Sequence, residues 1–213
     1  MAGKYSVLGP GLAFPDISQA TISRLENLFT RYPRYNKYSA LFLGTRTKEM
    51  DCNLEVFGVL SHGQFCRENI LFKYKSNQDS ILSCCDVIFQ DVRHYHYGSC
   101  VFDLLQFIFT SVDPPVRHNF MADFICSVYY DNFAKTVSSI NSKLGMFTMK
   151  EFMREFIKNI LYGFFFSTEM QNELSKDADE VSDEKKNQQH EDHLLALIRD
   201  VLHFMMCAQA TIN

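Results

Sequence analysis

Three stretches of the sequence alternate apolar and polar residues, and this period of two restricts the fold more than any other feature. They are NLEVFGVL (53–60), ENILFKYK (68–75) and SILSCCDVIF (80–89). Successive side chains of a strand point to opposite faces, so the alternation predicts three β-strands. The polar segments 61–67 and 76–79 supply turn-forming residues between them. The sequence therefore predicts a three-stranded meander.

The rest of the pattern predicts how this meander closes. Residues 99–111 have apolar side chains at helical spacing, and two further strands are predicted at 117–130 and 134–141. Three strands, a helix and two strands are the elements of an OB-fold, a five-stranded Greek-key barrel. Gly58 lies in the middle of the first strand, where such a barrel needs a sharp bend.

Helices are predicted on both sides of the barrel. Residues 16–31 are amphipathic, Thr148 and Glu151 fit a capping box that opens a helix with a Met/Phe stripe, and 191–210 repeats the helical pattern. The predicted fold class is mainly β with flanking helices. The predicted units are an N-terminal arm with a short helix (1–37), the OB barrel (38–145), a helix (146–172), an acidic linker (173–192) and a C-terminal helix (193–213).

Composition limits the class of protein. The 213 residues are 46% hydrophobic with 20 Phe, which is enough to fill a core, and no apolar run is long enough to span a membrane. Seven cysteines without a signal peptide indicate reduced thiols in the cytosol or nucleus. The net charge is -4, and residues 173–192 account for more than all of it. The near-neutral remainder would need a local patch to bind nucleic acid.

The sequence predicts no metal, cofactor or catalytic site. Cys84 and Cys85 are neighbours on a strand, so their thiols point to opposite faces and cannot easily bind one ion. His94 and His96 could share a side of an extended segment, but they lack a second ligand pair. No phosphate-binding glycine loop, nucleophile elbow or H-E-x-x-H is present, so the chain is predicted not to be an enzyme. A metal-dependent or thiol enzyme is a third alternative.

Residues 58–89 (GVLSHGQFCRENILFKYKSNQDSILSCCDVIF) resemble the first three strands of an OB-fold family. This family contains the middle subunit of replication protein A and the Stn subunit of the telomeric CST complex. The resemblance rests on Leu54-Val56-Gly58-Val59, Phe72-Tyr74, Asn77-Gln78-Asp79-Ser80 and Ile81-Leu82-Ser83-Cys84 with Phe89. The family's turn carries two acids and a glycine, whereas this turn has only Asp79 and no glycine.

The resemblance implies a non-enzymatic subunit of a telomere-capping or single-stranded-DNA-binding complex, located in the nucleus at chromosome ends. In the family, the helix after the fifth strand packs on a second OB-fold protein, so this helix is predicted to bind a partner. The predicted partner contacts are Met149, Phe152, Met153, Phe156 and Ile160. The alternative for this stripe is that it belongs to the core. The resemblance also implies that other capping subunits are partners and that the protein does not bind a membrane.

Nucleic-acid contacts are predicted where cations and aromatic rings alternate, as in residues 31–38, because cations neutralise phosphates while rings stack on bases. The tyrosines of this segment could instead pack against the barrel. Phe72 and Tyr74 are predicted to fill the barrel. The predicted contacts are Arg34, Tyr35, Phe65, Arg67, Lys73, Lys75 and Tyr130. The alternative function is an OB-fold protein–protein interaction scaffold that binds no nucleic acid, which the near-neutral charge favours.

Overall fold

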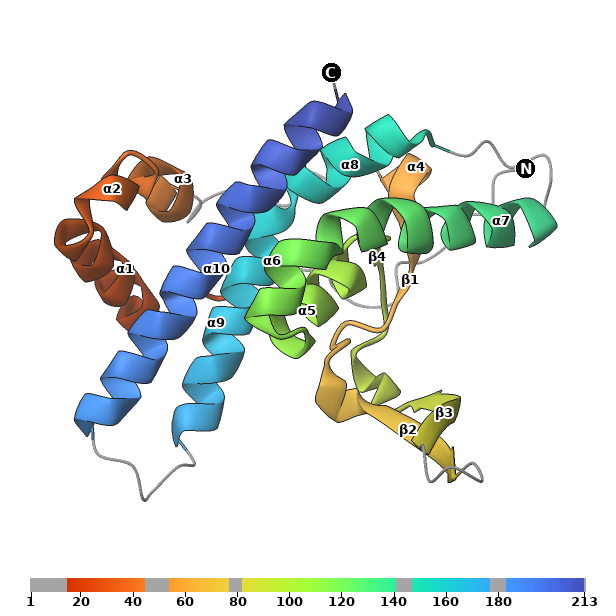
Figure 1. Cartoon of the computed structure of the whole chain (residues 1–213), viewed down its shortest axis with the longest axis horizontal. Coiled ribbons are helices and arrows are strands. Elements are labelled where there is room, and N and C mark those ends of the chain that lie inside the picture. Colours follow the sequence, from red (N-terminus) through yellow and green to blue (C-terminus); the bar gives the residue numbers. More distant parts are fainter. Residues whose placement is uncertain (1–14, 45–53, 77–81, 141–146, 177–182, 213) are drawn as a thin grey trace.

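The computed structural model describes residues 15–44, 54–76, 82–140, 147–176 and 183–212, and most of them are helical (Figure 1). The helices are α1 (Gln19–Arg31), α2 (Pro33–Asn36), α3 (Ser39–Leu43), α4 (Leu54–Phe57), α5 (Phe102–Ser111), α6 (Pro114–Asp123), the π-helix η4 (Phe124–Tyr130), α7 (Asp131–Ile140), α8 (Met149–Lys158), α9 (Ile160–Lys176) and α10 (Asp183–Ile212). The strands are β1 (Gly58–Ser61), β2 (Ile70–Ser76), β3 (Leu82–Phe89) and β4 (His96–Ser99).

The predicted OB barrel is wrong. In the described part of the chain the strands form two separate antiparallel pairs, β1 with β4 and β2 with β3, and no barrel closes around them. The strands predicted at 117–130 and 134–141 are wrong, because residues 117–130 and 134–140 are helical, in α6, η4 and α7. Their aromatic and β-branched residues favour strands locally, but tertiary packing overrides such propensities.

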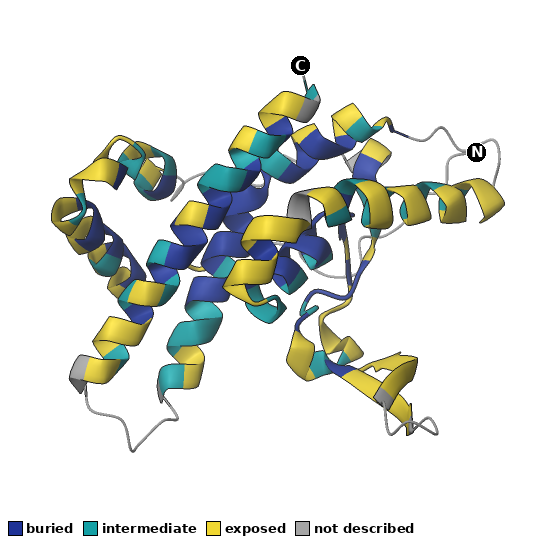
Figure 2. Ribbon diagram, in the orientation of Figure 1, coloured by how far each residue is buried: buried dark blue, intermediate teal, exposed yellow. Residues whose placement is uncertain are grey.

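The core lies where α5, α8, α9 and α10 meet, as the buried residues in Figure 2 show. Large side chains fill it: Leu105, Ile108, Phe109, Phe152, Phe156, Phe164, Phe165, Leu197, Ile198, Val201 and Phe204 are almost fully buried. Helices α5 and α9 approach closely at Gly163, where an added Cβ would lie 2.6 Å from the Phe109 ring and 2.9 Å from the Leu105 carbonyl oxygen. Glycine at this position therefore permits the contact between the two helices.

Two helix starts are capped by hydrogen bonds. The capping box of α8 is confirmed: the Glu151 N–H donates to the Thr148 hydroxyl, and the Thr148 N–H donates to the Glu151 carboxylate. Ser18 caps α1 by accepting a hydrogen bond from the Thr21 N–H. These contacts satisfy N–H groups that a helix start otherwise leaves unpaired.

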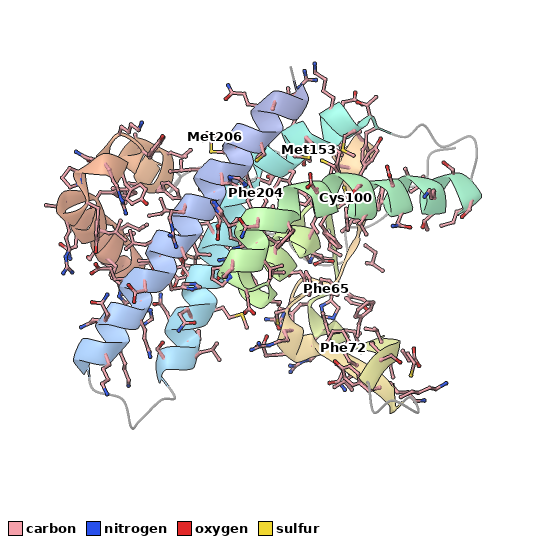
Figure 3. The ribbon with its side chains drawn as sticks, in the orientation of Figure 1. Phe65, Phe72, Cys100, Met153, Phe204 and Met206 are labelled. Atoms are coloured by element: carbon pink, nitrogen blue, oxygen red, sulfur yellow. The ribbon has the colours of Figure 1, made fainter. Side chains whose placement is uncertain are left out.

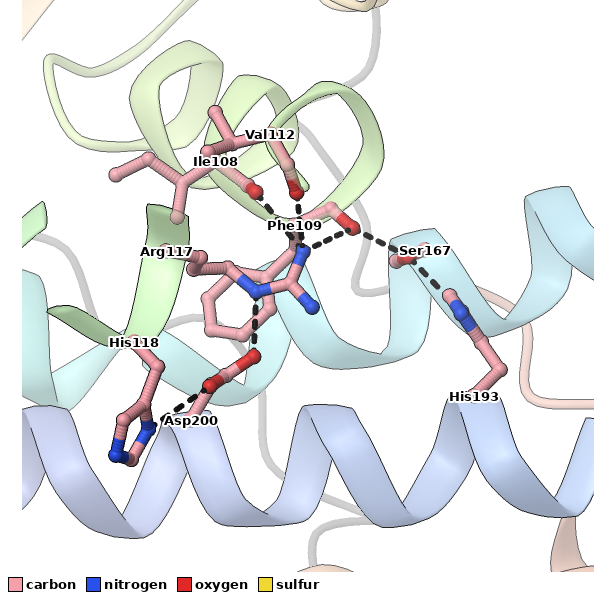
Figure 4. A network of polar contacts seen from close by, with 8 residues as sticks. All are labelled: Ile108, Phe109, Val112, Arg117, His118, Ser167, His193 and Asp200. Carbon is pink, nitrogen blue, oxygen red and sulfur yellow. Dashed lines mark hydrogen bonds and ion pairs between the residues drawn. The ribbon is translucent and has the colours of Figure 1, made fainter. Parts of the chain in front are cut away.

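A buried arginine fixes the end of α5 (Figure 4). Arg117 on α6 donates to the carbonyl oxygens of Ile108, Phe109 and Val112 at 3.2, 3.4 and 2.9 Å. Its Nε also pairs with the carboxylate of Asp200 on α10. A cation at a helix C-terminus is electrostatically favourable, so this contact stabilises α5 as well as joining three helices.

The β2–β3 hairpin projects away from the helical body (Figures 1 and 3). Both strands are confirmed close to their predicted bounds, with a register shift between Lys73 and Tyr74. The prediction that Phe72 and Tyr74 fill a barrel is wrong, since these side chains are 45% and 55% exposed. The polar turn that was predicted at 76–79 lies almost entirely outside the described residues.

The boundaries of the predicted units stay a prediction. Residues 183–192, assigned to an acidic linker, form the first turns of α10, and residue 172 lies within α9. Among the described helices, none combines the length and hydropathy needed to cross a membrane.

Candidate functional site: a loop and its pocket

The loop between β1 and β2 (residues 62–69), which ends in the short 3₁₀ helix η2 (Arg67–Asn69), is held by side chains of α5. Asp103, in the first turn of α5, accepts hydrogen bonds from the backbone N–H groups of His62 at 2.6 Å and Gly63 at 3.0 Å. A carboxylate is favourable at a helix N-terminus. The same carboxylate thus interacts with the helix dipole and fixes two successive residues of the loop.

Gln106 and Ser111 extend this attachment along the helix. The Gln106 side chain accepts from the Phe65 N–H at 2.7 Å and donates to the Gly63 carbonyl oxygen at 2.8 Å. Ser111 accepts from the Arg67 N–H at 2.7 Å. Three side chains on one helix therefore determine the backbone path of the loop.

The segment after β3 lies against the same loop. The His62 Nε2 atom is 2.7 Å from the carbonyl oxygen of Gln90, and the Gln90 N–H donates to the Asn69 carbonyl oxygen at 2.8 Å. Gly63 has a φ of 84°, and an added Cβ there would lie 2.2 Å from the His94 carbonyl oxygen. Only glycine fits this backbone conformation and this close approach.

A pocket of about 470 Å³ opens beside the loop, and we name it the Gln64 pocket. Its wall includes the rings of Tyr162 and Phe166 on α9, whose centroids are 6.0 Å apart. Its size is within the range of small-molecule sites. The residues around it are Pro15, Asp16, Gly63, Gln64, Cys66, Tyr162, Phe166, Glu169, Met170 and Glu173.

The Gln64 pocket is acidic. Asp16, Glu169 and Glu173 contribute carboxylates, and among the residues that the structure describes its lining includes no Lys, Arg or His. Glu169 is held in place, because its carboxylate accepts hydrogen bonds from the Ser18 N–H and the Thr21 hydroxyl. The pocket therefore favours neutral or cationic molecules over anions.

Two titratable groups of the pocket keep their protons. Burial raises the pKa of the Cys66 thiol, and a hydrogen bond to Glu68 raises it further, so this cysteine is a poor nucleophile. Burial also raises the pKa of the Tyr162 hydroxyl, which therefore stays a hydrogen-bond donor.

The loop has the residue spacing of a kinase catalytic loop. Kinases use H-x-D-x-x-x-x-N, in which the Asp accepts the proton of the substrate hydroxyl. Here His62 and Asn69 take the first and last positions, and Gln64 takes the place of the Asp. The D-F-G segment, which must lie near that Asn, corresponds in place to Ile88-Phe89-Gln90 at the end of β3.

The loop, the hairpin after it and the helices that hold it define a kinase-like protein. The chain belongs to the ecdysteroid kinase-like family, whose family model matches residues 13–142. Comparisons with curated proteins and with solved structures gave no significant match.

The family match corrects the main predictions from sequence. The resemblance to the OB-fold family of replication protein A and Stn is wrong, because it rested on a period of two that β2 and β3 share with any hairpin. The predicted telomere-capping or single-stranded-DNA-binding function, the alternative OB-fold scaffold and the predicted lack of enzymatic activity are contradicted by a kinase-like family. The predicted nuclear, telomeric location is not tested.

The predicted nucleic-acid contacts are scattered over the structure. Arg34 and Tyr35 lie on α2, at the opposite side of the molecule from Lys73 and Lys75 on the exposed hairpin (Figure 1). Tyr130 lies in η4 and donates to the Phe147 carbonyl oxygen at 2.7 Å. The family match contradicts the DNA-binding function to which these contacts were assigned, and no finding tests the individual residues.

Phe65 and Arg67 are the two predicted contacts that lie in the loop. The Phe65 ring packs against Phe89 and Phe107, with centroids 5.2 and 5.6 Å away, and Arg67 is exposed beside Glu68. Phe65 therefore links the loop to the end of β3.

The predicted partner-binding stripe lies on α8 and the start of α9. Phe152, Met153, Phe156 and Ile160 are buried, and Met149 is half-buried. The Phe156 ring packs edge-on against Phe204 of α10, with centroids 5.9 Å apart. No finding tests binding of a second protein through this stripe, so it stays a prediction.

Sequence reasoning missed Asp103, Gln106 and Tyr162. The spacing of His62 and Asn69 was a usable signal for the loop, although residues 61–67 were interpreted only as a turn. The contacts of α5 with the loop and with α9 join residues 40 or more positions apart, so no local pattern indicates them.

Proposed function

We propose that this protein is a kinase-like protein that binds a hydroxyl-bearing small molecule in the Gln64 pocket and has lost efficient phosphoryl transfer from ATP to it. The position of Gln64 in the structure supports this proposal most directly. It occupies the position of the kinase catalytic Asp, in a loop held by α5, and it lines a pocket with an apolar wall. Within the described residues its side-chain amide makes no hydrogen bond, so it is available to a ligand.

The proposed ligand class is a hydroxylated molecule with a rigid apolar body, such as an ecdysteroid. The family is named after ecdysteroids, which are hydroxylated steroids. Phe166 and Met170 offer apolar surface for such a body, while Gln64 and Tyr162 offer polar groups at one end. This arrangement is typical of small-molecule sites, where a few polar groups orient an apolar ligand.

Transfer is proposed to be slow because the amide of Gln64 cannot take a proton from a substrate hydroxyl as a carboxylate does. A positioned general base contributes about 10²–10⁴-fold to a rate. Kinases also hold magnesium with the D-F-G Asp and the catalytic-loop Asn. The residues here do not fit that ion: Ile88 stands in the place of the acid, and the described residues contain no cluster of three His, Cys, Asp or Glu able to hold a metal.

Calorimetric titration with ecdysone tests the binding site. Met170→Trp should fill the Gln64 pocket and abolish the binding that the wild type shows. Met206→Trp is the matched control, because Met206 is 71% exposed on α10 and its side chain does not line the pocket (Figure 3). Absence of ecdysone binding by the wild type, or unchanged binding by Met170→Trp, would show that the proposal is wrong.

A further inference from the structure

The orientation of the Gln106 amide is fixed by the backbone of the loop. A backbone N–H can only donate and a backbone carbonyl can only accept. Because the Phe65 N–H faces one end of the amide and the Gly63 carbonyl faces the other, Oε1 must point to Phe65 and Nε2 to Gly63. The two backbone partners alone therefore distinguish the oxygen of the Gln106 amide from its nitrogen.

This orientation determines the role of Tyr162. The Gln106 Nε2 atom also lies 2.7 Å from the Tyr162 hydroxyl oxygen, so Gln106 is the donor and Tyr162 the acceptor in this bond. A tyrosine hydroxyl can accept and donate at once. The proton of the Tyr162 hydroxyl is therefore left for another partner.

No acceptor for that proton is present in the described part of the chain. Tyr162 is 2% exposed, and buried polar groups nearly always have a partner. Its side chain lines the Gln64 pocket, so this pocket is the space from which an acceptor can approach. The free amide of Gln64 lines the same pocket.

We propose that the Tyr162 hydroxyl donates a hydrogen bond to an oxygen of the bound molecule, a hydroxyl or a ketone, and so turns that oxygen toward Gln64. The inference rests on the proposed function, because it names the group that orients the ligand of the same pocket. Gln106 then joins the ligand to the loop, through Tyr162 on one side and through Gly63 and Phe65 on the other.

Tyr162→Phe tests this role by removing the hydroxyl and keeping the ring. The dissociation constant for ecdysone should rise about tenfold, the effect of one lost hydrogen bond in a buried site. The melting temperature should fall only by the effect of one lost hydrogen bond, because Gln106 keeps its bonds to Gly63 and Phe65.

Tyr129→Phe is the matched control. Tyr129 is another tyrosine whose pKa is raised by burial, but its hydroxyl donates to the Cys100 carbonyl oxygen at 2.9 Å, and it lines a different pocket. This variant should lower the melting temperature and leave the affinity for ecdysone unchanged. Each variant loses one buried hydrogen bond, so the affinity for ecdysone is the measurement that should distinguish the two tyrosines.

The variants Met170→Trp and Tyr162→Phe distinguish a failure of the proposed pocket from a failure of the proposed role of Tyr162. If Met170→Trp abolishes binding but Tyr162→Phe binds as the wild type does, the pocket is correct and the role of Tyr162 is wrong. A crystal structure without ligand gives a second readout: an ordered water should lie about 2.8 Å from the Tyr162 oxygen on the pocket side. A protein carbonyl in that position would overturn the inference even if ecdysone does not bind.

Discussion

Arg117 on α6 and Asp200 on α10 form an ion pair with an N–O distance of 2.5 Å, in which the side chains are only 3% and 4% exposed. His118 approaches the other oxygen of the same carboxylate at 3.4 Å. Arg117 also binds the last carbonyl groups of α5, the helix that holds the loop. The ion pair therefore connects the packing of α10 to the helix on which the site depends.

Breaking this pair should destabilise the protein strongly. Asp200→Asn leaves Arg117 buried without its counter-charge, which costs about 3–5 kcal/mol in comparable pairs. Urea unfolding followed by circular dichroism measures the free energy of unfolding. Asp91→Asn is the control, since the Asp91–Arg93 pair is near the surface and should contribute at most about 1 kcal/mol. Equal losses in both variants would contradict this prediction.

Stability should fall with acid because of His193. Burial and the charge of Arg117 lower the pKa of this imidazole to about 4. In the unfolded chain its pKa is about 6.5, so the unfolded state binds the proton first as the pH falls. The free energy of unfolding should therefore decrease between pH 6.5 and pH 4, by at most about 1.4 kcal/mol per unit from this residue.

Urea unfolding at several pH values tests this contribution. His193→Gln keeps a polar group near the Ser167 hydroxyl, which lies 3.3 Å from the imidazole, but it cannot titrate. The slope between pH 6.5 and pH 4 should become smaller in this variant. An unchanged slope would mean that other groups cause the acid sensitivity.

Gly63→Ala should distort the loop. The added Cβ would meet the His94 carbonyl oxygen at 2.2 Å, and the φ of 84° disfavours any side chain. We expect a loss of about 1–3 kcal/mol in the free energy of unfolding and weaker ecdysone binding. In Gly44→Ala nothing lies within 4 Å of the new Cβ, so that variant should behave as the wild type.

Restoring the two acids of a kinase should accelerate phosphoryl transfer. Gln64→Asp supplies a proton acceptor, and Ile88→Asp supplies a carboxylate at the D-F-G position, where the present side chain is exposed. With ATP, magnesium and ecdysone, the double variant should transfer phosphate at least about 10²-fold faster than the wild type. The control is Gln64→Asn, which should not accelerate transfer. No gain in the double variant would contradict the kinase-like role of the loop.

The acidic Gln64 pocket should reject anionic ligands. A phosphate ester of ecdysone should bind at least about tenfold more weakly than ecdysone at low salt, because Asp16, Glu169 and Glu173 repel it. The double variant Asp16→Asn/Glu173→Gln should reduce this difference, and so should added salt. Equal affinity for ecdysone and its ester would show that the three carboxylates do not face the ligand.

Some local elements were predictable from the sequence, whereas others and the assembly of all of them were not. The amphipathic pattern of 16–31, the alternation in β2 and β3 and the capping box of α8 each depend on near neighbours in the chain, and each was predicted correctly. The strands expected at 117–130 and 134–141 were wrong because aromatic residues that favour strands also suit a helix packed against a core.

The candidate site likewise contains some features that the sequence indicates and others that it does not. His62 and Asn69 have a spacing that can be found by eye, whereas the bond between Gln106 and Tyr162 joins residues 56 positions apart. Whether the amide of residue 106 meets a loop or a solvent molecule depends on the packing of α5 against α9. That packing is decided by core volume at positions such as Gly163, which no local pattern specifies.

Every hydrogen bond that Asp103, Gln106 and Ser111 make to the loop ends on a main-chain atom: the N–H groups of His62, Gly63, Phe65 and Arg67, and the carbonyl of Gly63. Main-chain atoms are the same in every residue except for the missing N–H of proline. Evolution can therefore exchange the side chain at position 64 without moving the loop. The chemistry of the site can diverge on a scaffold whose shape α5 preserves.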